Sequence, residues 1–66
     1  MSEGEGTRRL LHDLRGSLNG VALQLEVMAL AFARGDEGLH GRALEAARRA
    51  MQAAAEKVDA LQGEGR

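Results

Sequence analysis

Several residue types are missing from this chain of 66 residues, and each absence limits what the protein can be. There is no cysteine, so a disulfide and a thiolate metal site are both excluded. The two histidines, His12 and His40, form no zinc motif with nearby acids, and we predict no bound metal and no cofactor. A chain this short usually needs a disulfide, a metal or a partner chain, so oligomerisation is the remaining source of stability.

Strong net charge and long apolar runs are missing too. The net charge of −1 argues against a protein that coats nucleic acid or an anionic membrane. No uninterrupted apolar run is long enough to span a bilayer, and no signal-peptide pattern opens the chain. We therefore expect one small cytoplasmic domain over residues 1–66, with neither nucleic acid nor membrane as a partner.

The composition predicts an all-α fold. Proline, tryptophan and tyrosine are absent, and Phe32 is the only aromatic residue. Twelve residues are alanine, and leucine, arginine and glutamate are common. These residues favour helices, whereas the β-branched and aromatic residues that favour strands are scarce.

The first helix is predicted over about residues 7–34. Thr7 is a plausible N-cap, and Gly35 is a natural left-handed residue for the position after the last helical turn. We expect the glycine-rich segments 1–6 and 63–66 to be flexible tails.

A second helix is predicted over about residues 36–62. Asp36 is a suitable N-cap, but Gly38 and Gly41 weaken the first turns, so we expect a firm helix only near Arg42. Because the connection is so short, the two helices must form an antiparallel hairpin.

Apolar residues recur in steps of three and four along both predicted helices, as in the seam of a left-handed coiled coil or bundle. The predicted seam consists of Leu11, Leu14, Leu18, Val21, Leu25, Met28 and Phe32 in the first helix, and Leu44, Ala47, Met51, Ala54, Val58 and Leu61 in the second. A second stripe, Leu23, Val27 and Leu30, lies on a different face and would be exposed in a lone hairpin. We therefore expect two hairpins to pack as a homodimeric four-helix bundle, more open around His12 than at the turn.

The segment from His12 to Asn19, HDLRGSLN, carries the most specific chemistry. His12 follows Leu11 and is rotated from the seam by about 100°, onto a polar face where an imidazole can act as a nucleophile. Asp13 either accepts a proton from one ring nitrogen or stabilises the early turns of the helix. Arg15 either pairs with phosphoryl oxygens or is a solvated surface charge.

This segment resembles the phosphoacceptor box of sensor histidine kinases, typically H-[ED]-L-R-x-P-L. The region from about residue 7 to residue 62 resembles their dimerisation and histidine phosphotransfer domain, which is a four-helix bundle of two hairpins. The resemblance implies that His12 is the phosphoacceptor, Asp13 the adjacent acid that acts as a base, and Arg15 the basic residue of the box.

Two positions depart from the family's pattern. Gly16 stands where the family has threonine or asparagine, which helps to position water during dephosphorylation of the receiver. Ser17 replaces the proline that kinks the helix. The chain also ends where the ATP-binding domain of a kinase would begin, so we do not expect it to be a complete histidine kinase on its own.

Three hypotheses follow. The preferred one is a histidine phosphotransfer and dimerisation module of a two-component signalling system, in which His12 accepts phosphoryl from a separate kinase ATP-binding domain or a response-regulator receiver domain. The alternative is a non-catalytic dimeric protein that binds or inhibits a histidine kinase or response regulator. The third is a remnant or a piece of a larger kinase.

Overall fold

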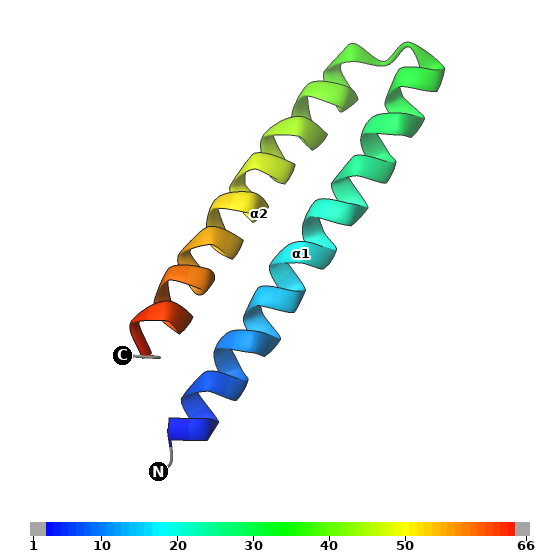
Figure 1. Cartoon of the computed structure of the whole chain (residues 1–66). Coiled ribbons are helices and arrows are strands. Elements are labelled where there is room, and N and C mark those ends of the chain that lie inside the picture. Colours follow the sequence, from blue (N-terminus) through cyan, green and yellow to red (C-terminus); the bar gives the residue numbers. More distant parts are fainter. Residues whose placement is uncertain (1–2, 65–66) are drawn as a thin grey trace.

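The computed structural model describes residues 3–64, which form a single antiparallel helical hairpin (Figure 1). Helix α1 spans Glu3–Arg34 and helix α2 spans Glu37–Glu64. The hairpin is a rod with extents of 50 × 14 × 12 Å. The predicted all-α fold and the hairpin are confirmed.

The turn between the helices uses the residues that the sequence predicted for it. Gly35 has a φ of 68°, a left-handed conformation that glycine adopts without a steric cost. Its N–H donates to the Phe32 carbonyl at 3.1 Å, and the Asp36 N–H donates to the Ala31 carbonyl at 2.9 Å. This pair of bonds is a Schellman motif, which satisfies two carbonyls at the end of α1.

Asp36 then begins α2. Its Oδ1 accepts a hydrogen bond from the Leu39 N–H at 3.0 Å, and its carbonyl accepts one from the His40 N–H at 3.0 Å. A cap of this kind contributes about 1 kcal/mol, which is comparable to the cost of one helical glycine. Consequently α2 is helical from Glu37, and the predicted weak stretch before Arg42 is not seen.

Helix α1 also starts earlier than predicted. It begins at Glu3, so Thr7 lies within the helix and does not cap it. Glu5 lies near the start of α1, where negative charge is favoured by the positive end of the helix dipole. Of the predicted tails, residues 3–6 and 63–64 are helical, and residues 1, 2, 65 and 66 lie outside the described residues.

The core of the hairpin is a narrow contact between what we term the inner faces of the two helices. The inner face of α1 consists of Leu10, Leu14, Ser17, Val21, Gln24, Met28 and Ala31, and that of α2 of Ala43, Ala47, Ala50, Ala54, Lys57 and Leu61. The most buried side chains are alanines, with Ala31 at 0 % exposure. Gly20 is level with Ala50, because a Cβ added to Gly20 would lie 3.7 Å from the Ala50 Cβ.

Half of the predicted seam does not contribute to this core. Leu14, Val21 and Met28 are partly buried against α2. Seven other seam residues are large and exposed, with Phe32 at 82 %, and form what we term the outer apolar face: Leu11, Leu18, Leu25, Phe32, Leu44, Met51 and Val58.

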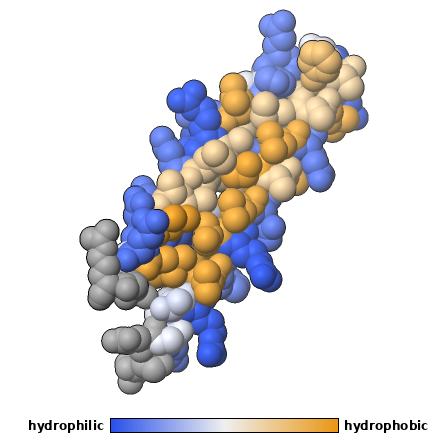
Figure 2. Space-filling view, in the orientation of Figure 1, coloured by the Kyte–Doolittle hydropathy of each residue, from blue (hydrophilic) through white to orange (hydrophobic). Residues whose placement is uncertain are grey.

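The outer apolar face forms one continuous surface on the hairpin. Each of its residues directly follows an inner-face residue in the sequence and is rotated from it by about 100°. Because the helices are antiparallel, this rotation brings both rows to the same side of the hairpin. Figure 2 shows this side as an apolar band that runs along the molecule between charged edges.

Helix α1 is long and apolar enough to cross a membrane by length and composition, over Gly4–Arg34. Signal sequences near an N-terminus and core helices of soluble proteins have the same features, so this is weak evidence for a membrane span. Ser17–Arg34, the more apolar half of α1, includes Gln24 and Glu26.

Candidate functional site

His12 lies in the N-terminal half of α1, on the side opposite α2. Its side chain is 88 % exposed, and the neighbouring Asp13 side chain is 48 % exposed. The His12 Nδ1 lies 3.7 Å from the Asp13 Oδ1, a distance at which the carboxylate attracts a protonated ring without a close hydrogen bond. The other ring nitrogen, Nε2, is the one available for a reaction with an external group.

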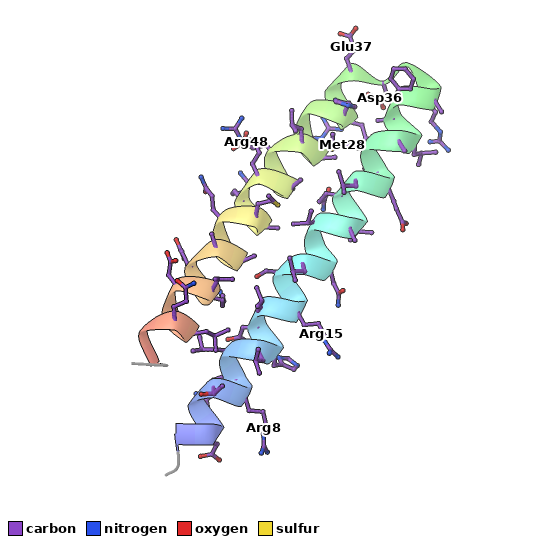
Figure 3. All side chains as sticks on the ribbon, viewed as in Figure 1. Arg8, Arg15, Met28, Asp36, Glu37 and Arg48 are labelled. Carbon is purple, nitrogen blue, oxygen red and sulfur yellow. The ribbon has the colours of Figure 1, made fainter. Side chains whose placement is uncertain are left out.

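Arg15 is one helical turn after His12 and is exposed. It projects from the side of α1 that faces away from α2 (Figure 3). All three residues that the sequence assigned to the site are exposed, with Asp13 on one side of His12 and Arg15 on the other. This arrangement can present a nucleophile, an adjacent acid and a guanidinium to a partner protein.

Arg8 was not included in the site by the sequence reasoning, and the structure places it one turn before His12. It projects on the same side of α1 as Arg15 (Figure 3). The spacing of Arg8 and His12 by four residues is the signal that could have revealed it.

Gly16 follows His12 by one turn and leaves an open space. A Cβ added there would meet no atom within 4 Å. Position 16 therefore has room for a side chain. Ser17 is partly buried on the inner face and α1 continues through it.

The turn end of the hairpin offers no second reactive constellation. His40 is partly buried beside a shallow hollow lined by Ala31, Phe32, Asp36 and Glu37. Within the described residues, no group of three or more His, Asp or Glu side chains is placed to hold a metal ion.

Comparisons with protein families, with curated proteins and with solved structures find no match to this chain. The functional argument therefore depends on the residues and geometry of the hairpin.

Proposed function

We propose that this chain is a histidine phosphotransfer and dimerisation module of a two-component signalling system. His12 accepts a phosphoryl group from a response-regulator receiver domain or from a kinase ATP-binding domain supplied in trans. The observation that carries the proposal is the exposed His12 imidazole with Asp13 beside its Nδ1, at the end of a helical hairpin.

The transfer is a displacement at phosphorus. Nε2 of a neutral His12 forms the new bond, and the bond from phosphorus to the aspartyl oxygen of the receiver, or to the β-phosphate oxygen of ATP, breaks. The leaving oxygen keeps the electron pair. Asp13 stabilises the positive charge that develops on the ring, and Arg15 contacts the phosphoryl oxygens. Much of the catalysis comes from positioning by the partner.

The same geometry also bears on whether the module would hydrolyse the phosphate of a phosphorylated receiver. Gly16 provides no polar side chain to orient a water molecule toward a phosphorylated receiver. We therefore propose that the module transfers phosphoryl groups between proteins without accelerating their loss to water.

The outer apolar face supports a homodimer as the working unit. A second copy with its turn at the same end would place the two outer faces together and complete a four-helix bundle. This face differs from the stripe to which the sequence argument assigned the dimer, since Leu23 and Leu30 lie on the opposite flank of α1. A soluble hairpin with seven large apolar side chains exposed on one side is an unusual surface for a monomer.

The edges of the outer face also fit a second copy. Gly20 and Ala50 lie at the same height along the hairpin. Because the helices are antiparallel, Arg15, five residues before Gly20, is level with Ala55, five residues after Ala50. By the same count, Ala22 is level with Arg48. These residues lie at the edges of the face, so α1 of one copy would meet α2 of the other with each arginine beside an alanine. No arginine of one copy would oppose an arginine of the other.

We propose a cytoplasmic location for this module. A membrane-spanning α1 would place Gln24 and Glu26 in the bilayer, and a charged side chain there costs about 2.5 kcal/mol or more. In the bundle, Gln24 lies on the inner face and Glu26 faces water.

The proposal is tested by mixing the purified chain with a receiver domain phosphorylated on its aspartate, from the same organism. An acid-labile, base-stable label should move to this chain, and His12→Gln should abolish it while the protein keeps its helix content and mass in solution. Asp13→Ala should slow the transfer. Normal binding of the receiver by both wild type and His12→Gln, without transfer in either, would instead support the non-catalytic interaction protein.

A further inference from the structure

Two arginines bracket the phosphoacceptor candidate on one flank of α1. Arg8 precedes His12 by four residues and Arg15 follows it by three, so each is a surface neighbour of the imidazole. Arg8 and Arg15 are themselves seven residues apart and project on the same side of the helix (Figure 3).

Both guanidinium groups are available to a ligand. Arg8 and Arg15 are exposed, and among the side chains that the structure describes neither has a carboxylate within ion-pair distance. The acidic residues on their flank are Glu5, three residues before Arg8, and Glu26, eleven residues after Arg15, and neither forms an ion pair with Arg8 or Arg15. Arg9 differs, because it lies on the other flank of His12, where Asp13 is its neighbour four residues later.

We propose that Arg8 and Arg15 form a two-guanidinium cradle for a tetrahedral phosphate group at His12. The inference rests on the proposed function and adds Arg8, together with a binding site for free inorganic phosphate in the unmodified protein. In the cradle, the guanidinium groups hold the oxygens that are not exchanged, while the phosphorus faces Nε2.

The direction in which helical side chains lean predicts that the two arginines contribute unequally to phosphate binding. Side chains in an α-helix lean toward its N-terminus, so Arg15 leans toward His12 and the His12 ring leans toward the turn that contains Arg8. Arg8 must fold back along the helix to reach the same phosphate. Arg15 therefore contributes more than Arg8, and both contribute more than an arginine at the turn.

The binding half is tested by titrating inorganic phosphate into the full chain and following the NMR signals of the His12 ring and the arginine side chains. We expect weak, saturable shifts at His12, Arg8 and Arg15 that potassium chloride at equal ionic strength does not reproduce. Arg8→Gln and Arg15→Gln should each weaken binding, by about fivefold for Arg15→Gln. Arg42→Gln, which removes the same charge near the turn, should leave binding unchanged. Equal weakening by all three variants would overturn the cradle.

The reactive half is tested with phosphoramidate, a small donor that requires no partner protein. Nε2 forms a bond to phosphorus, the phosphorus–nitrogen bond of the donor breaks, and ammonia leaves with the protons of the donor's ammonio group. We expect Arg15→Gln to slow labelling of His12 by about fivefold and Arg8→Gln to slow it less, with partial recovery in Arg8→Lys. Labelling of Arg8→Gln at the wild-type rate would overturn the role of Arg8.

The two experiments separate this inference from the proposed function. If a phosphorylated receiver labels His12 at a rate that is insensitive to Arg8 and Arg15, the proposed function holds and the cradle is wrong. If no receiver or kinase domain labels His12, but phosphate binding and phosphoramidate labelling both depend on Arg8, the cradle holds and the proposed function is wrong.

Discussion

The two rows of apolar residues on α1 have the same repeat but opposite environments. The inner face contains Leu14, Val21 and Met28 and is covered by α2, whereas Leu11, Leu18 and Leu25 on the outer apolar face are open to solvent. The outer row is the more apolar of the two, because the inner row also includes Ser17 and Gln24. The hairpin therefore buries the less apolar row of α1 and leaves the more apolar row exposed to solvent.

The largest expected effect is the difference between a substitution on the outer apolar face and the same substitution on the opposite flank of α1. Leu25 and Leu23 are almost equally exposed in the hairpin, at 54 % and 56 %. Leu25→Asp should dissociate or unfold the protein, because a charge buried without a partner in the bundle costs several kcal/mol. Leu23→Asp is the matched control and should leave the mass in sedimentation equilibrium at twice that of the chain. Equal tolerance of both substitutions would contradict a dimer through the outer face.

The next effect compares the two rows of α2. Ala47 is 7 % exposed on the inner face, so Ala47→Leu should force the helices apart and cost about 1–3 kcal/mol of the free energy of unfolding. Met51→Leu, a change of similar volume on the outer face, should cost less than about 1.5 kcal/mol. Urea denaturation followed by circular dichroism measures both. A larger loss for Met51→Leu would mean that the rows are wrongly assigned.

The turn sets the register that brings the inner rows together. Gly35→Ala places a Cβ on a residue with a φ of 68° and should cost about 1 kcal/mol. Gly41→Ala is the control, because Gly41 is helical with nothing near its added Cβ, and it should be neutral or stabilising. The melting temperatures of both variants, followed by circular dichroism, test this prediction. A Gly35→Ala protein that is more stable than wild type would contradict the turn described above.

The smallest effect concerns the polar member of the inner face. Gln24→Leu should stabilise the hairpin by about 0.5–1 kcal/mol, because Gln24 is partly buried and leucine adds apolar area there. Asn19→Leu changes an exposed position and serves as the control. No difference in unfolding free energy between the two variants would show that position 24 does not face α2.

The sequence predicts the fold and the turn well, because these depend on local chemistry. Helix-forming composition, the left-handed position of Gly35 and the cap at Asp36 are each readable from neighbouring residues. Which of the two rows of α1 is buried against α2 cannot be read from neighbouring residues in the sequence. Leu14, Val21 and Met28 belong both to the predicted seam and to the inner face, and the small side chains of Ala43, Ala47 and Ala54 on α2 allow the close approach that buries the row containing Ala31.

The candidate site was predicted in part for a similar reason. His12, Asp13 and Arg15 are recognisable from their spacing, and in the structure all three are exposed, with Asp13 and Arg15 on either side of His12. Arg8 was missed although it lies four residues before His12 within the predicted helix, because the resemblance is specific only over the segment from His12 to Asn19.

The most direct measurement for the phosphotransfer role is the location of the phosphoryl group after incubation with a phosphorylated receiver domain. Mass spectrometry of peptides kept at alkaline pH should place a single phosphoryl group on His12, with none on His40 at the turn. A group found on His40, on Ser17 or on Thr7, or an unmodified chain after the receiver has lost its phosphate, would contradict the account.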